Sequence, residues 1–365
     1  MESHKKHISI DCRMINASGI GTYLRNLVPG IINASQDIRF SLLCKKDAMS
    51  IFPWTHADNV SLIDCQSPIY SINEQFELPR KIPAETNVFW SPHYNIPLFY
   101  SGKLVVTVHD IFHLAMPQYV GGLHKRLYAR LMFTAVRRKA DSIICVSHFT
   151  ESELMRLTNK GYQKINVIYN GVDELWFGIK KMQNPHGRAF ILYVGNVKPH
   201  KNLKVLIQAF NLIVKKIPHD LVIIGKREGL ITPDKKVVGV VANLNRVHFI
   251  GSVEDNTLQQ YFAHADVLVL PSMYEGFGLP PLEAMACGCP VVVSKVASLP
   301  EVCGDAAYYI NPYDVNSIAD GIYDVITKTD LKETLITKGL QRAKMFSWEK
   351  SAKEHIKVFE EVLNS

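Results

Sequence analysis

The stretch from Asp266 to Glu301, DVLVLPSMYEGFGLPPLEAMACGCPVVVSKVASLPE, constrains the fold of this chain more than any other. It begins with a short apolar run ending at a proline, which is typical of a strand covered on both faces. After a glycine-rich loop, Pro280 and Pro281 preset the backbone for a helix that Gly288 ends. The apolar run 290–294 predicts the next strand. Because open α/β sheets bind ligands at the carboxyl ends of their strands, the loop is a predicted ligand site.

Short apolar runs alternate with amphipathic helical stretches through the rest of the chain. This alternation predicts parallel sheets that are covered by helices on both faces. The polar segment Lys180–Gly187 interrupts it, and we therefore expect two domains, 1–178 and 188–346, with a final helix at 347–365. The predicted strands are 7–11, 39–44, 60–64, 88–90, 104–108, 142–146 and 165–169, and then 190–194, 221–224, 247–250, 266–270, 290–294 and 307–310.

Local signals predict several helix boundaries and faces. Gly19 and Gly21 predict a tight turn that precedes the first helix. The stretch 72–82 is typical of a helix with Glu74 on its polar side. Thr150, followed three residues later by a glutamate, matches a capping box at the start of another helix.

Composition is typical of a two-domain globular protein. The chain has 365 residues, of which 47% are apolar, enough for a large core. No apolar run reaches the ~18 residues of a membrane span, and the start MESHKKHISID lacks the apolar segment of a signal peptide. The seven cysteines form no C-x-x-C pair, which favours reduced thiols in a cytosolic protein. The 14 histidines show no metal-ligand spacing, so we predict no metal site.

Positive charge is concentrated in the first half of the chain. Residues 1–170 carry 19 Lys and Arg against 13 Asp and Glu, whereas the remainder is nearly balanced, at 22 against 21. The helical stretch Gly122–Lys139 holds six of these basic residues beside an apolar stripe of Leu123, Leu127, Leu131 and Ala135. Such a helix favours peripheral contact with an anionic membrane, although a stripe packed on the sheet gives the same pattern. Aromatic residues are not interleaved with the basic ones, which argues against nucleic acid as a partner.

Two carboxylates frame the glycine-rich loop. Glu275 lies within it, and Glu283 lies eight residues later at the start of the predicted helix. The helix dipole favours the charged form there, so we expect Glu283 to be ionised and to accept hydrogen bonds. This pair suits the binding of ribose or sugar hydroxyls. A purely helix-starting role for Glu283 is the simpler alternative.

Basic side chains follow successive strands of the second domain, where they would attract a diphosphate. Lys198 and Lys201 lie in the loop 195–202, and Arg227 follows the next strand. A single loop lysine is usually just solvated. Because the three lie in successive strand-end loops, we interpret them as an anion site, with Lys201 the strongest candidate.

In the first domain, glycines and histidines follow the strands. Gly19 and Gly21 permit close approach of a phosphate to the backbone, although a tight turn explains them equally well. His109 and, with less support, His93 follow buried strands. Placement at strand ends favours a functional role for His109, whereas a lone histidine is more often structural.

Five motifs together point to one family: IDCRMINASGIGTYL (10–24), VTVHDIFHL (106–114), NGVD (170–173), LYVGNVKPHKNL (192–203) and YEGFGLPPLEAMACGCPVVVS (274–294). They resemble those of glycosyltransferase family 4 (group 1), retaining GT-B enzymes that include bacterial O-antigen and exopolysaccharide mannosyltransferases. The resemblance covers essentially the whole chain. It implies two Rossmann-like domains facing across a cleft, the first for the acceptor and the second for a nucleotide-sugar donor, with the last helix crossing back to the first domain.

The resemblance also implies residue roles. Glu275 would contact the donor sugar, Glu283 would hold the ribose hydroxyls, and Lys201 would neutralise the diphosphate. Many family members carry an arginine where this chain has Asn196. Either Lys198 or Arg227 supplies the missing charge, or the donor binds more weakly. The implied catalytic residues are His109, Lys201 and Glu275, and the implied donor-binding residues are Gly19, Gly21, Asn196, Lys198, Lys201, Arg227, Val253, Glu275, Gly276, Phe277, Gly278, Leu279 and Glu283.

The implied reaction is a metal-independent transfer of a hexose with retention of configuration. The expected donor is GDP-mannose, and the expected acceptor is a surface glycan carried on a polyprenyl diphosphate. We expect a cytoplasmic enzyme, peripheral to the inner face of the plasma membrane. The alternatives are a UDP- or dTDP-sugar donor, a phosphorolysing or epimerising relative, and a non-catalytic subunit that binds nucleotide-sugars. A nicotinamide-dependent oxidoreductase fits less well. Such enzymes carry an acidic residue at the end of the second strand, whereas this chain has Cys44-Lys45-Lys46 there.

Overall fold

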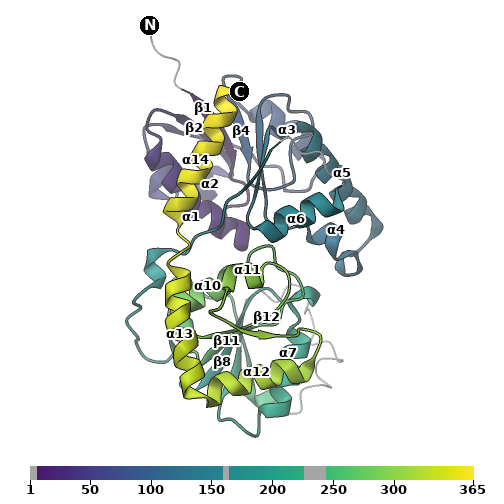
Figure 1. Ribbon diagram of the computed structural model, residues 1–365. Helices are drawn as coiled ribbons and strands as arrows, with labels where there is room; N and C mark the ends of the chain where they lie inside the picture. The colour runs from purple at the N-terminus through teal and green to yellow at the C-terminus, as the bar shows by residue number, and fades with distance from the viewer. Residues whose placement is uncertain (1–5, 159–163, 226–243) are drawn as a thin grey trace. The chain divides into compact units, whose positions relative to one another are not determined.

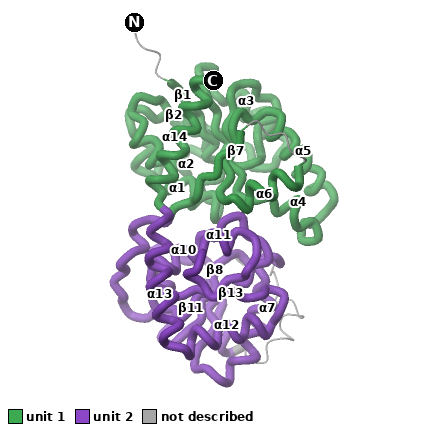
Figure 2. The backbone as a smooth tube through the Cα atoms, in the orientation of Figure 1, with its two compact units in different colours: residues 1–171, 347–365 green, residues 172–346 purple. Residues whose placement is uncertain are grey.

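The computed structural model describes residues 6–158, 164–225 and 244–365. The chain forms two compact units, one of Met1–Gly171 with Ser347–Ser365 and one of Val172–Phe346 (Figure 2). The stretch 172–189, which includes the polar segment Lys180–Gly187, is part of the second unit. The predicted site residue Arg227 lies outside the described residues.

Unit 1 is built on a seven-stranded parallel sheet with the order β3-β2-β1-β4-β5-β6-β7 (Figure 1). Its central strands are buried along their whole length, because helices cover both faces of the sheet, and three of them are accordingly mostly apolar in sequence (VFWS, LVVTV and SIIC), whereas the first, HISID, buries polar side chains as well. The strands are β1 (His7–Asp11), β2 (Arg39–Cys44), β3 (Val60–Asp64), β4 (Val88–Ser91), β5 (Leu104–Val108), β6 (Ser142–Cys145) and β7 (Ile165–Val167).

The last helix of the chain belongs to unit 1, where it packs along α1. Its side chain His355 lies 2.6 Å from the hydroxyl of Tyr23 on α1, within the core. The helices of this unit are α1 (Gly19–Ala34), α2 (Lys46–Met49), α3 (Glu74–Lys81), α4 (Phe112–Ala115), α5 (Leu123–Lys139), α6 (His148–Leu157) and α14 (Trp348–Asn364), with 3₁₀ turns at Pro53–His56 and Pro117–Tyr119.

Unit 2 repeats the design with a six-stranded parallel sheet of order β10-β9-β8-β11-β12-β13 (Figure 1). Its strands are β8 (Phe190–Val194), β9 (Asp220–Ile224), β10 (Val247–Gly251), β11 (Val267–Leu270), β12 (Val291–Ser294) and β13 (Tyr308–Ile310). Its helices are α7 (Leu203–Ile213), α9 (Asp255–His264), α10 (Leu279–Ala286), α11 (Leu299–Cys303), α12 (Val315–Thr327) and α13 (Thr329–Ala343), with 3₁₀ turns at Glu174–Trp176, Pro199–Lys201 and Leu244–Arg246. Among the described helices, none has both the length and the hydropathy needed to cross a bilayer.

Three local predictions were wrong. Helix α1 begins at Gly19, so Gly19 and Gly21 lie in its first turn and not in a turn before it. Helix α6 is capped by the Ser147 hydroxyl, which accepts a hydrogen bond from the amide of Thr150. Glu74 is buried, with 1% of its surface exposed, because α3 turns this side chain into the unit. Local sequence signals identified these helices but not their first residues or their buried faces.

The two strand orders place ligand sites at specific loops. In an open parallel sheet, the loops on either side of the point where strand order reverses leave a crevice at the carboxyl edge. That point lies between β1 and β4 in unit 1 and between β8 and β11 in unit 2. The loops that follow these four strands are therefore the candidate ligand loops.

Candidate active site

The crevice of unit 2 holds a close ion pair between two predicted site residues. Lys201 follows β8 and Glu275 follows β11, and the lysine Nζ lies 2.6 Å from both carboxylate oxygens. The two side chains are 21% and 11% exposed, so the pair is accessible at the carboxyl edge of the sheet. An ammonium group has three N–H donors, and this pairing leaves a third for a ligand oxygen. The structure thus brings together two residues that are 74 positions apart in the sequence.

The position of Lys201 depends on Asn202, which the sequence analysis did not single out. Asn202 adopts a left-handed conformation with φ of 61°, where few residues other than glycine and asparagine are tolerated. Its buried side-chain amide donates to the carbonyls of Pro271 at 3.1 Å and Pro312 at 2.7 Å. Asn202 therefore fastens the loop after β8 to the loops after β11 and β13. The tolerance of asparagine for this conformation was the only sequence signal for its role.

Replacement of Asn202 tests this interpretation. Asn202→Ala should destabilise unit 2 by about 2–4 kcal/mol, because it removes two buried hydrogen bonds and places a Cβ-bearing residue at positive φ. Asn202→Gly removes the same hydrogen bonds without the backbone strain, so its stability should lie between those of Asn202→Ala and wild type. Thermal and urea unfolding measure these differences. Equal stability of all three proteins would contradict the proposed role.

The glycine-rich loop is held in shape by Ser298, whose hydroxyl donates to the carbonyls of Glu275 at 2.9 Å and Phe277 at 2.8 Å. Gly278 caps α10 with φ of 101°, and a Cβ there would lie 2.8 Å from the side chain of Leu299. Leu279 is the first residue of α10. The loop conformation is thus fixed by contacts within unit 2.

The expected charge state of Glu283 is not supported. Desolvation of its carboxyl group, together with the smaller effect of the nearby Asp255 charge, raises the pKa to about 8. Glu283 lies in the second turn of α10, past the first-turn amides that would stabilise a carboxylate. At neutral pH the neutral form therefore predominates in the ligand-free protein, in contrast to the prediction.

The other predicted donor residues of unit 2 lie in strand-end loops. Asn196 follows β8 and is half-buried, and Lys198 in the same loop is exposed. Val253 follows β10 and is half-buried. Phe277 packs edge to face against Phe346, with 5.9 Å between ring centroids. Gly276 lies between Glu275 and Phe277 in the glycine-rich loop. These positions are compatible with a ligand at the carboxyl edge, and their individual roles stay predictions.

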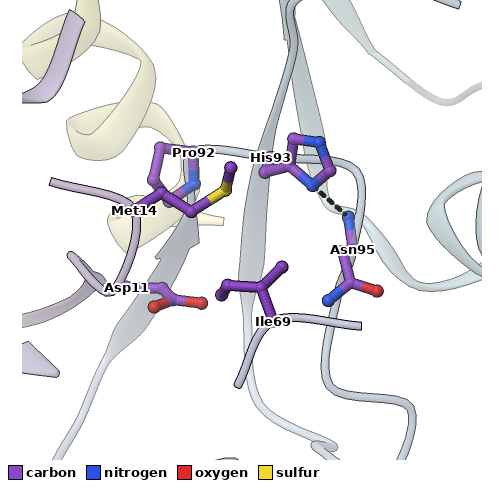
Figure 3. A pocket seen from close by; sticks show the side chains of 6 residues that line it. All are labelled: Asp11, Met14, Ile69, Pro92, His93 and Asn95. Carbon is purple, nitrogen blue, oxygen red and sulfur yellow. Dashed lines mark hydrogen bonds between the residues drawn. The ribbon is translucent and has the colours of Figure 1, made fainter. Parts of the chain in front are cut away.

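Unit 1 has a pocket at its own crevice (Figure 3). Asp11 and Met14 line it from the end of β1, and Pro92, His93 and Asn95 line it from the segment after β4, together with Ile69. The labelled side chains converge from these segments, and the backbone N–H of Asn95 donates to Nδ1 of His93 at 3.2 Å. The pocket therefore occupies the site that the strand order of unit 1 specifies.

A buried network of charges supports this pocket. Arg13 pairs with Asp11 at 2.7 Å and with Glu74 at 3.1 Å, and the three side chains are 3%, 8% and 1% exposed. The side-chain amide of Asn95 donates to Glu74 at 2.8 Å and accepts a hydrogen bond from the Tyr128 hydroxyl. Neither Arg13, Asn95 nor Tyr128 was predicted. Because they are far apart in sequence, only the folded structure brings these residues together.

Both histidine candidates of unit 1 are neutral at physiological pH. Burial lowers the pKa of His109 to about 4 and that of His93 to about 3. The Nε2 atom of His109 donates to the carbonyl of Pro92 at 2.9 Å, which leaves Nδ1 as the acceptor nitrogen. His93 contacts the Tyr70 hydroxyl at 3.1 Å through Nε2. His109 can thus accept a hydrogen bond from a hydroxyl group, but its low pKa makes it a weak base.

The two glycines of α1 differ in their surroundings. A Cβ at Gly21 would lie 2.5 Å from the carbonyl oxygen of Ile15, so the close approach there is to the protein's own backbone. A Cβ at Gly19 would meet no atom within 4 Å. Contact of either glycine with a diphosphate stays a prediction.

Comparison with known proteins identifies the family. Residues 17–174 match the family model described as Glycosyltransferase Family 4, and residues 176–342 match the model described as Glycosyl transferases group 1. O-antigen chain mannosyltransferase B of Escherichia coli is 32% identical over 289 residues, which cover 74% of each chain. This chain belongs to the group 1 glycosyltransferases. The O-antigen chain mannosyltransferase RfbU of Salmonella typhimurium is 30% identical to this glycosyltransferase over 233 residues, covering 64% of this chain and 63% of that protein.

Solved structures resemble this glycosyltransferase in fold. Sucrose-phosphate synthase from Thermosynechococcus elongatus has a TM-score of 0.77 at 21% identity, covering 98% of this chain and 99% of that chain. Anabaena HepE, in complex with UDP and glucose, has a TM-score of 0.78 at 19% identity, covering 98% and 100%. The predicted GT-B fold class, with two Rossmann-like parallel sheets, is confirmed.

Proposed function

We propose that this glycosyltransferase moves mannose from GDP-mannose, with retention of configuration, to a growing surface polysaccharide of the O-antigen class. The names of the E. coli and S. typhimurium relatives support the sugar and the pathway class. The observation that carries the donor site is the Lys201–Glu275 pair at the crevice of unit 2. We assign the donor to this crevice and the acceptor glycan to the pocket of unit 1.

The proposed chemistry follows from charge. When the bond between the anomeric carbon and the diphosphate oxygen breaks, its electron pair remains on the diphosphate. Lys201 and the amides of the glycine-rich loop stabilise that charge, and such preorganised stabilisation is commonly the largest part of catalysis. The acceptor oxygen bonds to the anomeric carbon from the same face, and its proton passes to the departing phosphate oxygen. Glu275 then binds sugar hydroxyls, and no step requires a metal.

A donor panel tests the proposal. Purified enzyme is incubated with GDP-mannose, UDP-glucose or dTDP-rhamnose and a polyprenyl-diphosphate oligosaccharide, with and without EDTA. We expect transfer from GDP-mannose in both buffers, and an α-linked product by the one-bond carbon–proton coupling of the new anomeric centre. A β-linked product, or transfer that EDTA abolishes, would contradict the retaining or metal-free part.

A UDP-hexose is the second candidate donor. The specific observation in its favour is the structural likeness to Anabaena HepE, which is described in complex with UDP-glucose. That likeness is at 18% identity and concerns the fold. Preferred turnover of UDP-glucose in the same panel would establish this alternative and reject mannose.

The raised pKa of Glu283 predicts a pH-dependent donor affinity. If the carboxylate accepts hydrogen bonds from the ribose, only the ionised form binds well, and its pKa of about 8 makes that form scarce at low pH. The Kd of GDP-mannose, whose diphosphate diester does not titrate in this range, should fall by roughly tenfold from pH 6.5 to 8. Calorimetric titration measures it. Glu283→Gln should bind weakly with no such dependence, and a flat wild-type profile would reject the ribose role.

We propose that helix α5 brings unit 1 to an anionic membrane that carries the acceptor. Leu123, Leu127 and Leu131 are 69%, 55% and 54% exposed, so the alternative that this stripe packs on the sheet is wrong. The opposite side of α5 is buried through Ala129, Met132, Phe133 and Val136. Basic residues flank the exposed leucines, as in helices that bind lipid surfaces. The same helix contributes Tyr128 to the network beneath the pocket, which suits a glycan whose carrier is a polyprenyl diphosphate.

Introduction of negative charge on the exposed stripe tests membrane contact. The double variant Leu127→Glu/Leu131→Glu should lose at least about tenfold in affinity for phosphatidylglycerol vesicles, because it removes apolar contact and adds negative charge. Both sites are exposed, so thermal stability should hardly change. Vesicle co-sedimentation measures binding. Leu175→Glu, at a 72% exposed leucine of unit 2, is the matched control, and equal loss in both proteins would contradict the assignment.

A further inference from the structure

Three potential metal-binding side chains meet at the amino end of the unit 2 sheet. His186 precedes β8, Asp220 is the first residue of β9, and His248 is the second residue of β10. The Nε2 atoms of His186 and His248 lie 2.9 and 3.2 Å from Oδ2 of Asp220. Each residue offers one ligand atom within 4.8 Å of the other two. The sequence separations are 34 and 28 residues, so no metal-ligand spacing is visible along the chain.

Two of the three ligand-atom separations in this cluster are close to those of a tetrahedral metal site, and the third is within 4.8 Å. With metal–ligand bonds of about 2.0–2.1 Å, the ligand atoms of tetrahedral zinc lie about 3.3 Å apart. The two measured separations from Asp220 already approach that value. In addition, Nε2 of His248 is buried and has no hydrogen-bond partner among the described residues. Its 3.2 Å contact with Asp220 is an ion pair without hydrogen-bond geometry, and a small cation between the two groups would satisfy both atoms.

The surroundings hold the carboxylate in place. Arg246 donates from Nε to Oδ1 of Asp220 at 3.1 Å, and its other nitrogens bind the backbone carbonyls of Val214, Ile217 and His219. Oδ2 is therefore the oxygen available to a metal, and Oδ1 has the outer hydrogen bond that usually orients a ligating carboxylate. Arg188 lies 3.5 Å from Oδ2 and opposes a cation there, but its side chain is 60% exposed and can turn into solvent.

We propose that His186, Asp220 and His248 bind one divalent transition-metal ion, with zinc the best match, and that water completes the coordination. Two imidazoles and one carboxylate suit zinc and its neighbours better than magnesium or calcium, which prefer all-oxygen sites. The metal would fasten the segment 172–189 to the sheet. Gln260 on α9 already forms hydrogen bonds with the backbone of Lys180 and Met182 in this segment. The site lies at the opposite end of five-residue strands from Lys201, about 16 Å away along the strand direction. Its role is therefore structural, and it does not enter the transfer chemistry.

Metal binding by the full chain, prepared without an added histidine tag and stripped with EDTA, tests the proposal. Titration with ZnCl₂ should show one equivalent bound per chain. At a free zinc concentration 100 times the Kd, the Tm of unit 2 should rise by about 5 °C or more. MgCl₂ should have no such effect. Elemental analysis after gel filtration gives the stoichiometry, and scanning calorimetry gives the Tm.

Variants decide whether these residues are the ligands. His186→Ala and His248→Ala should each lose the bound equivalent and the Tm shift, whereas His148→Ala, which removes the exposed His148–Glu151 pair, should retain both. If His248→Ala does not fold, His186→Ala decides the question, because it changes only the segment ahead of β8. No saturable binding in wild type, or binding that survives in His186→Ala, overturns the proposal. In that outcome the cluster is an ion-pair network only.

Discussion

Lys201→Ala is expected to lower kcat/KM for the nucleotide-sugar donor by roughly 100- to 1,000-fold, the range observed when one preorganised electrostatic contact to a developing anion is removed. The variant loses the positive charge beside the proposed diphosphate position. It also leaves the Glu275 carboxylate, now 2.6 Å from Nζ, without its partner. An unpaired carboxylate near a dianionic leaving group adds repulsion to the lost attraction. Initial rates of nucleotide release at varied donor concentration measure the effect.

Neighbouring lysines provide the controls for this prediction. Lys204 is exposed on α7, three residues later. Lys204→Ala removes the same charge at a position away from the crevice and should retain full activity. Lys198→Ala tests whether this exposed loop residue replaces the arginine that the chain lacks at Asn196, in which case donor KM rises several-fold. The double variant Lys201→Ala/Glu275→Ala should be less impaired than the product of the single losses, because the residues act as a pair. Full activity of Lys201→Ala would refute the donor-site assignment.

The architecture was predictable because it depends on repeating local patterns. Apolar runs of four to six residues, each followed by a glycine or a polar loop, predict buried parallel strands regardless of distant contacts. The stretch Asp266–Glu301 folds as expected into β11, a glycine-rich loop, α10 and β12. Lys201 and Glu275 were each predicted as residues of the donor site, and they meet because both follow strands whose carboxyl ends face the same edge. Strand order, which the sequence did not provide, explains why these two loops and no others flank the crevice.

The residues that the sequence did not reveal act through contacts between distant segments. Glu74 has the sequence context of a solvated helix face, yet α3 buries it against Arg13, which lies 61 positions earlier. Ionisation states were missed for a related reason. Desolvation of the Glu283 carboxyl in the folded protein raises its pKa, and this effect outweighs the dipole of a short helix. Burial is a tertiary property, so neither the network nor the pKa values follow from spacing alone.

Arg13→Leu is expected to destabilise unit 1 by roughly 3–5 kcal/mol at pH 8, because it leaves the carboxylates of Asp11 and Glu74 buried without a counter-charge. The guanidinium is the only positive group that the described ion pairs place against these two carboxylates. Urea unfolding followed by tryptophan fluorescence reports on this unit, which contains three of the four tryptophans. Arg25→Leu is the matched control. It loses a 2.8 Å hydrogen bond to the carbonyl of Ile15 but leaves no buried carboxylate unpaired, so it should lower the unfolding free energy by about 1 kcal/mol.

The loss of unfolding free energy in Arg13→Leu, called its deficit below, should also depend on pH. The buried Glu74 carboxyl determines whether this deficit grows or shrinks with pH. Burial raises the pKa of Glu74 above its usual 4.5, and the hydrogen bond from Asn95 and the charge of Arg13 limit that rise. A carboxyl with a raised pKa in the folded state stabilises the fold at low pH and loses this contribution as pH rises through that pKa. Without Arg13 the pKa of Glu74 rises further, so the deficit should shrink as pH falls from 8 towards 5.

Glu74→Gln in the Arg13→Leu background removes the ionisable group. It should restore part of the stability at pH 8 and flatten the pH dependence. A deficit that is equal at both pH values, or a double variant no more stable than Arg13→Leu, would show that packing and not charge accounts for the role of Arg13.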